Sequence, residues 1–240
     1  MSSRKLNLRL PMKPIQLAAH AGALVPLALL AWDFFTNNLT YNPIQAATQR
    51  TGLTAIVLLL LSLACTPLYT LTGFAPLLNL RRPFGLYAFL YVSIHLSIFF
   101  AWDYAFDWDL ILKTISEKPY IVAGLSAFLL LSPLAFTSYQ YWMKRMGKNW
   151  KRLHRLVYLA GGLAVLHFAW GVKGNFTQIQ GDVGKPLLAA IVLSILFFLR
   201  IPAVRKKIRS LRRRSRPGQA VVVRRKVSAP TPAEPYQDQK

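Results

Sequence analysis

The chain has 240 residues, of which 54% are hydrophobic and only 16% are charged. Soluble domains average about 25% charged residues, so this composition excludes an ordinary soluble globule. The formal net charge is +22, from 30 basic and 8 acidic residues. Because the basic residues gather at the ends of apolar runs, they indicate contact with anionic membrane lipids and no nucleic-acid partner. The single cysteine, Cys65, excludes a disulfide framework and cysteine-based metal clusters.

Six apolar segments are long enough to cross a bilayer, which requires about 20 mostly apolar residues. They are residues 15–32, 51–71, 84–104, 120–142, 153–172 and 185–201. The sequence therefore predicts an all-α integral membrane protein, a six-transmembrane-helix bundle. Three regions are expected: a cytoplasmic N-terminus (1–14), the six-helix domain (15–201) and a basic, proline-rich cytoplasmic tail (202–240).

The charges divide unequally between the two sides of this bundle. Of the 30 Lys and Arg residues, 25 fall on the side of the termini, whereas six of the eight acidic residues fall on the other side. An excess of Lys and Arg marks the cytoplasmic side of a membrane protein, so both termini are predicted to be cytoplasmic. The basic cluster at 205–216 is expected to lie on anionic headgroups. The proline-rich stretch beyond Gly218 is expected to be disordered.

All four histidines fall within or at the ends of the apolar segments, where ionisable residues usually have a function. They are His20, His95, His154 and His167. At about 1.5 Å per helical residue, His95 lies roughly 20 Å beyond Arg82 and His167 roughly 18 Å beyond Arg155. Both arginines mark the cytoplasmic edge, so the two imidazoles are expected at nearly the same depth. Such a pair can ligate one haem iron from opposite faces, although a buried histidine can also be purely structural.

A second, inner level lies near the cytoplasmic edge. His154 precedes His167 by 13 residues, and Arg81 precedes His95 by 14 residues. Arginine does not ligate iron because it stays protonated, but it pairs well with a haem propionate or a flavin phosphate. We therefore predict an inner site of His154 and Arg81, with Arg82 and His20 as further candidates, for a second haem or a flavin. The alternative is that His154 only caps or snorkels at the membrane edge.

Small and aromatic residues near the outer pair suit a flat macrocycle. Gly161 and Gly162 would let a porphyrin ring approach the helix backbone, or would serve close helix packing. The third segment carries many aromatic side chains, which are also ordinary in membrane helices. They are Phe84, Tyr87, Phe89, Tyr91, Phe99 and Phe100.

Three stretches of the sequence resemble one known family. They are RRPFGLYAFLYVSIHL (81–96), AFTSYQYWMKRMGKNWKRLHRLVYL (135–159) and HFAWGVK (167–173). Together they resemble MsrQ, formerly YedZ, the haem-binding membrane subunits of the bacterial methionine sulfoxide reductase system, within the ferric-reductase-like transmembrane group. The resemblance spans about residues 15–200 and leaves the tail outside.

The resemblance implies an electron-transfer subunit in the bacterial inner membrane. Electrons would pass from the quinol pool or a cytoplasmic flavin reductase, through one or two b-type haems, to a periplasmic molybdopterin reductase, MsrP. It also implies FMN as a cofactor and haem ligation by His95, His154 and His167, while His20 matches a further family histidine. The outer segments 102–119 and 173–185 lack metal-ligand spacing and a nucleophile–base pair, so the sulfoxide chemistry is expected in the partner.

Other classes of function remain open from the residues alone. A stand-alone quinol-oxidising cytochrome b or ferric reductase is the main alternative. A transporter would need internal repeats or charged residues in mid-membrane, and intramembrane Asp, Glu and Lys are nearly absent. A scaffold protein with structural histidines is the third alternative. An absorbance spectrum of the purified protein separates a haem protein from both the transporter and the scaffold.

Overall fold

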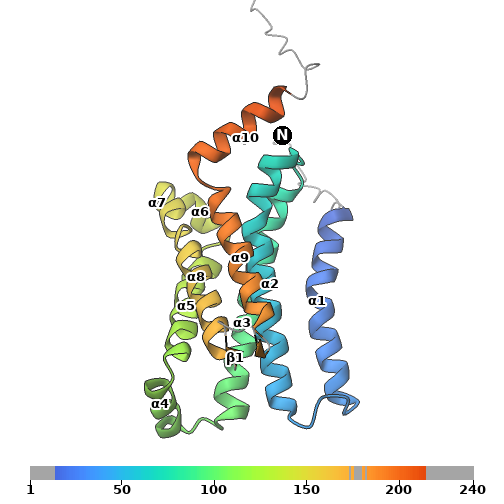
Figure 1. The fold of residues 1–240 in the computed structure, drawn as a ribbon, viewed down its shortest axis with the longest axis vertical. Coiled ribbons are helices and arrows are strands. Elements are labelled where there is room, and N and C mark those ends of the chain that lie inside the picture. Colours follow the sequence, from blue (N-terminus) through green and yellow to red (C-terminus); the bar gives the residue numbers. More distant parts are fainter. Residues whose placement is uncertain (1–13, 173, 176–179, 182, 215–240) are drawn as a thin grey trace, which may run out of the picture.

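The computed structural model describes residues 14–172, 174–175, 180–181 and 183–214. Within these residues the chain is a helical bundle with one hairpin, whose two strands have two residues each (Figure 1). Five helical segments are long and apolar enough to cross a membrane, and the bent pair α9 and α10 would make a sixth. This agrees with the multi-pass helical membrane protein expected from the sequence. The predicted cytoplasmic N-terminus falls almost wholly outside the described residues, as does the tail beyond residue 214.

The helices follow the predicted segments, with some differences at their ends. The first four elements are α1 (Pro14–Phe35), α2 (Pro43–Thr72), α3 (Leu77–Ile98) and the π-helical turn η1 (Phe99–Asp103) that continues α3. The next five are α4 (Trp108–Glu117), α5 (Pro119–Phe136), α6 (Gln140–Met146), α7 (Lys148–Leu153) and α8 (Leu156–Gly171). The antiparallel strands β1 (Gly174–Asn175) and β2 (Gln180–Gly181) precede α9 (Gly184–Phe198) and α10 (Pro202–Arg214).

Local signals set several of these boundaries. Helix α2 begins at Pro43 because the side chain of Asn42 accepts a hydrogen bond from the Gln45 amide at 3.0 Å. The helix ends at Thr72, and the next residue, Gly73, caps it in the left-handed conformation with a φ of 79°. Asp107 caps α4 in the same way, accepting from the Leu110 amide at 3.0 Å. The loop expected at 102–119 therefore contains a short helix.

One predicted span ends earlier than expected, and part of the predicted tail is helical. The span expected at 120–142 ends at Phe136, and the chain then turns into α6. The span expected at 153–172 lies within the candidate span Lys148–Gly171, which has a local break at His154 between α7 and α8. Residues 202–214, assigned to the basic tail, form helix α10, which bends 75° from α9. Val204, Ile208 and Leu211 lie at i, i+4 and i+7, so these residues share one apolar face that favours a helix.

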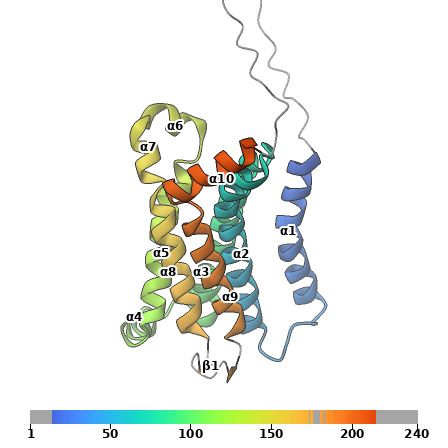
Figure 2. The same ribbon diagram turned by 45° about the horizontal axis from the view of Figure 1, so that its top comes forward.

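Two helix pairs form the centre of the bundle. Helix α2 packs most extensively on α3, and α5 packs most extensively on α8. Small buried residues, Ala55 on α2, Ala88 on α3 and Ala160 on α8, allow the helices to approach closely. Helix α1 lies at the edge of the bundle (Figures 1 and 2). The hydroxyl of Tyr91 on α3 donates to the Ala23 carbonyl of α1 at 2.8 Å and ties this helix to the core.

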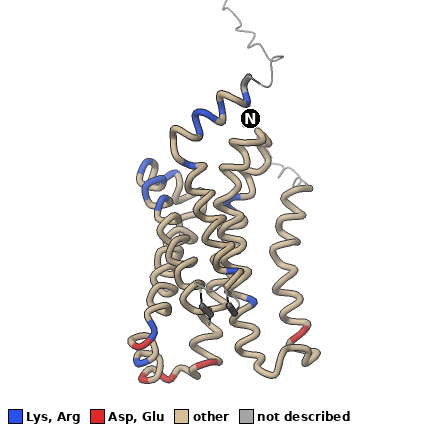
Figure 3. The backbone as a smooth tube through the Cα atoms, viewed as in Figure 1, with Lys and Arg blue, Asp and Glu red and all other residues tan. Residues whose placement is uncertain are grey.

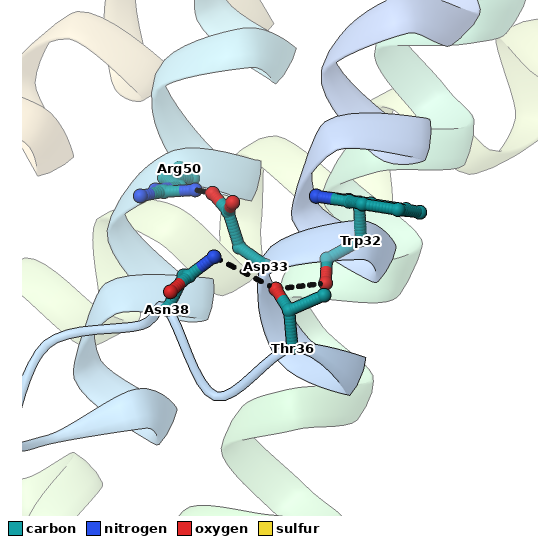
Figure 4. A network of polar contacts seen from close by, with 5 residues as sticks. All are labelled: Trp32, Asp33, Thr36, Asn38 and Arg50. Carbon is teal, nitrogen blue, oxygen red and sulfur yellow. Dashed lines mark hydrogen bonds and ion pairs between the residues drawn. The ribbon is translucent and has the colours of Figure 1, made fainter.

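Charge separates the two ends of the bundle. The start of α1, α6, α7 and α10 lie at the upper end in Figure 1, and α4 and the hairpin lie at the lower end. In the described part of the chain, basic residues crowd the upper end and all the acidic residues lie toward the lower end (Figure 3). One of the bases at the lower end, Arg50 of α2, is paired with Asp33 of α1 (Figure 4). This polarity matches the charge distribution from which the orientation was predicted.

Candidate cofactor site

The structure brings His95 and His167 together in the lower half of the bundle. Their ring centres are 6.1 Å apart and their ring planes are inclined at 83°. A metal–imidazole bond is about 2.0 Å long and the ring centre lies roughly 1 Å behind the nitrogen, so one metal between two imidazoles sets the ring centres about 6 Å apart. The two rings therefore stand at a separation that suits one shared metal ion.

Each imidazole is held by a main-chain carbonyl on a neighbouring helix. Nδ1 of His95 lies 2.9 Å from the Thr48 carbonyl oxygen of α2. Nδ1 of His167 lies 2.7 Å from the Tyr120 carbonyl oxygen of α5. A carbonyl only accepts hydrogen bonds, so Nδ1 must carry the proton in both rings. The lone pair then lies on Nε2, which is the arrangement of a metal-ligating histidine.

Both histidines line one cavity of about 730 Å³. Most of its lining is apolar, formed by Leu, Ile and Val side chains together with small and aromatic residues, which are Gly52, Ala55, Ala88, Gly124, Ala127, Ala164, Phe99, Phe100, Phe128 and Phe168. Its charged lining residues are Lys118, Lys185 and Asp103. The cavity thus combines a mostly apolar lining with two lysines, which suits a flat apolar ring bearing carboxylates.

The donor set identifies the kind of metal site. No group of three His, Cys, Asp or Glu side chains that could hold a metal ion occurs in the described residues. Two imidazoles alone do not complete the coordination of a protein-bound metal ion. They do complete that of a haem iron, because the porphyrin supplies the other four nitrogens. The residues present therefore fit a haem with two axial histidines.

The predicted inner residues lie nearer the upper end and contact different neighbours. His154 stacks on Trp150 with ring centres 3.9 Å apart, and its Nδ1 lies 3.1 Å from the Trp150 carbonyl oxygen. Its Nε2 atom is buried and makes no direct hydrogen bond in the described structure, although the Leu134 carbonyl also acts on the imidazole. A buried lone-pair nitrogen without a hydrogen bond is rare unless it binds a ligand or water, so His154 also fits a metal-ligand role.

The two arginines and His20 have partners of their own. Arg81 donates to the Thr66 hydroxyl at 3.2 Å and to the Leu78 carbonyl at 3.3 Å, whereas Arg82 lies over the Tyr139 ring at 5.7 Å. Nδ1 of His20 lies 2.9 Å from the Tyr87 hydroxyl and helps to hold α1 against α3. His20 is therefore explained as a helix contact and is absent from the described lining of the cavity.

The glycines that lie against the cavity histidines are not Gly161 and Gly162, which the sequence suggested for close approach of a ring. A Cβ on Gly161 would meet Leu63 and Leu193 at 3.4 and 3.6 Å, which is ordinary helix packing, and a Cβ on Gly162 would meet nothing within 4 Å. Gly52 and Gly124 lie directly against His95 and His167 instead. The sequence does contain a signal for these two glycines, which is a repeat with a spacing of 72 residues. Thr48, Gly52 and His95 are followed 72 residues later by Tyr120, Gly124 and His167, respectively.

Comparison with known proteins assigns part of this helical bundle to a broad class of transmembrane proteins. The family described as "Ferric reductase like transmembrane component" matches residues 51–165, which contain most of α2, all of α3 and α5, and most of α8. Close relatives then narrow the assignment.

Several similar proteins are named protein-methionine-sulfoxide reductase heme-binding subunit MsrQ. The protein of Xanthomonas euvesicatoria pv. vesicatoria (strain 85-10) is 44% identical over 82% of this chain and 90% of its own length. That of Xanthomonas campestris pv. campestris (strain 8004) is 45% identical over 77% and 84%. That of Bordetella pertussis (strain Tohama I / ATCC BAA-589 / NCTC 13251) is 40% identical over 80% and 89%. The chain belongs to the MsrQ family.

Proposed function

We propose that this chain is the haem-binding, electron-transferring membrane subunit of a methionine sulfoxide reductase system. The observation that carries the proposal is the pair His95 and His167, which line one cavity with their Nδ1 atoms bound to main-chain carbonyls. A b-type haem held there would supply one-electron redox chemistry. With His95 and His167 both holding the iron, the haem would have no free position for a substrate.

The protein's own residues would perform three tasks at this site. His95 and His167 would ligate through Nε2, and the carbonyls of Thr48 and Tyr120 would keep both rings in the ligating tautomer. The alanine and phenylalanine wall would exclude water from the ring. Lys118 and Lys185 in the lining of the cavity would pair with the negatively charged propionates of the haem.

The inner site would supply a second step across the membrane. We place a second haem or FMN near His154, because its Nε2 is buried without a direct hydrogen bond in the described chain and the surrounding helix ends are basic. Arg81 and Arg82 would reach propionates or a phosphate after exchanging their present contacts. Electrons would enter from the quinol pool or a cytoplasmic flavin reductase at this end, which would be the cytoplasmic one because it carries the excess of Lys and Arg.

Electrons would leave at the lower end, toward a periplasmic molybdopterin reductase of the MsrP kind in the bacterial inner-membrane system. The test is reoxidation of the dithionite-reduced protein, followed at the haem absorbance. We expect rapid reoxidation when the purified periplasmic reductase and a sulfoxide substrate are both present, and none when either is omitted. Turnover of the sulfoxide by this subunit alone would contradict the proposal, and reoxidation by ferric chelates but not by the reductase would favour the ferric-reductase alternative.

The acidic segment at the lower end should steer this partner. Asp109 and Glu117 belong to α4, whereas Asp107 caps that helix and must stay intact. We expect Asp109→Asn with Glu117→Gln to slow reoxidation at low salt, with the difference shrinking at high salt as charges become screened. Replacing Lys113 by Gln, a charge change of opposite sign on the same helix, should not slow it. Equal rates for all variants at every salt concentration would exclude steering by this segment.

Helix α10 should bind anionic lipid at the cytoplasmic face. A pocket of about 770 Å³ lies between α10 and the end of α2, and its cationic lining residues are Arg200, Arg205, Lys206, Arg209 and Arg212. Arg212 also donates to the Tyr69 and Thr70 carbonyls and is structural. We expect Arg205→Gln, Lys206→Gln and Arg209→Gln together to lower the anionic phospholipid that co-purifies, measured by native mass spectrometry. Neutralising Lys144, Lys148 and Lys151 is the charge-matched control, and an equal loss there would show a nonspecific effect.

A further inference from the structure

The two cavity histidines contact their neighbouring helices in the same unusual way. His95 reaches the Thr48 carbonyl of α2 where Gly52 follows four residues later. His167 reaches the Tyr120 carbonyl of α5 where Gly124 follows four residues later. In both cases the hydrogen bond goes to a helical carbonyl and the imidazole ring lies against the glycine one turn further on.

This spacing has a physical reason. A carbonyl inside an α-helix already accepts from the amide four residues later, but it has a second lone pair. Helical side chains lean toward the N-terminus, over the preceding turn. The side chain at position i+4 therefore shields the carbonyl at position i. Glycine at i+4 removes that shield and lets an outside donor use the second lone pair.

The fit of the rings leaves no room for a side chain at either position. A Cβ on Gly52 would lie 3.1 Å from both Cε1 and Nδ1 of His95. A Cβ on Gly124 would lie 2.7 Å from Nδ1 and 2.9 Å from Cε1 of His167. The His167 contact is closer than real Cβ atoms tolerate, so alanine at 124 must displace the ring, while alanine at 52 needs a smaller shift.

The arrangement occurs twice with different side chains at the acceptor position. Threonine supplies one carbonyl and tyrosine supplies the other, and 47 residues separate the two partners in each hydrogen bond. What the two sites share is the backbone carbonyl, the glycine at i+4 and the histidine. The acceptor side chains are therefore not what the site requires.

We infer that Gly52 and Gly124 are positioning residues that tune the redox potential of the metal held by His95 and His167. This inference rests on the proposed haem function. A hydrogen bond from Nδ1–H to a carbonyl makes the imidazole a more basic ligand, and a more basic ligand favours the ferric over the ferrous state. Displacing the ring from its carbonyl weakens the hydrogen bond from Nδ1–H and makes the imidazole a less basic ligand. The midpoint potential of the haem should therefore rise.

The experiment compares Gly124→Ala and Gly52→Ala with Gly162→Ala, the matched control on α8 whose added Cβ meets nothing within 4 Å. Each full-length, haem-loaded protein is titrated spectroelectrochemically, and its low-spin EPR g-values and haem content are measured. We expect a positive shift of potential and altered g-values for Gly124→Ala, a smaller change for Gly52→Ala and none for Gly162→Ala. Haem retention should fall by about tenfold or more in Gly124→Ala, as for other residues that orient metal ligands.

The possible outcomes separate the inference from the function on which it rests. If wild type shows no low-spin haem spectrum, the proposed function fails and the inference falls with it. If wild type is normal and both glycine variants match Gly162→Ala in potential and g-values, the inference alone is overturned. Should Gly124→Ala not accumulate, the milder Gly52→Ala decides the question by the same readouts.

Discussion

Replacing either His95 or His167 by alanine is expected to abolish the contribution of the outer haem to the low-spin Soret and α bands of the purified protein. Each ring would hold the iron of that haem, and the described residues contain no group of three His, Cys, Asp or Glu side chains that could take its place. The affinity for the outer haem should therefore fall by far more than the roughly 10–100-fold typical for residues that only orient a ligand. The measurements are the reduced-minus-oxidised spectrum and the haem-to-protein ratio.

The matched control for these variants is His20→Ala. His20 lies on α1 and bonds to the Tyr87 hydroxyl, away from the cavity. Its loss should loosen α1 but leave the low-spin spectrum in place. Full low-spin spectra in both His95→Ala and His167→Ala, with membrane insertion unchanged, would show that the assignment of the two axial ligands is wrong.

Replacing His154 by alanine is expected to remove the inner cofactor while sparing the outer one. The imidazole stacks on Trp150 and keeps a buried Nε2 that makes no direct hydrogen bond among the residues described. Its loss leaves Trp150 in place, still donating to the Thr137 carbonyl at 2.9 Å, so the α6–α7 region should stay folded. Haem and flavin per protein are measured before and after the substitution.

The pigment that disappears identifies the inner cofactor. Loss of about half of the haem would assign a second haem to His154, whereas loss of flavin with haem unchanged would assign FMN. The conservative variant Arg82→Lys retains the charge, so it should have a weaker effect than Arg82→Ala if a propionate or phosphate is bound nearby. Unchanged haem and flavin in His154→Ala would mean that this residue only caps the break between α7 and α8.

Sequence patterns alone were enough to predict the membrane class and the pairing of His95 with His167. Hydropathy and charge are local properties, so the apolar runs and the crowding of Lys and Arg at one end could be read directly. Helical rise is fixed at about 1.5 Å per residue, so equal depth for His95 and His167 followed from counting alone. The contact between the two rings agrees with that count.

Local pattern was a poorer guide where backbone geometry breaks the helix. Tyr139, Tyr141 and Trp142 extend the aromatic character of this segment although α5 ends at Phe136, and Gly147 adopts a φ of 51° between α6 and α7. Residues 202–214 were assigned to the basic tail, yet they form a helix with one apolar face. The end of α5 and the start of α10 therefore depend on helix packing and on the turn that precedes each segment, and not on amino-acid composition alone.

The way in which the two histidines are held became visible only in the folded chain. Hydrogen bonds to the Thr48 and Tyr120 carbonyls join residues 47 positions apart, and a main-chain acceptor leaves no trace in the acceptor's side-chain identity. The glycine pair at 161–162 resembled a ring platform in sequence, but the glycines against the rings are Gly52 and Gly124. Which face of a helix meets a ring depends on how neighbouring helices rotate and cross, and that is settled by packing across the whole bundle.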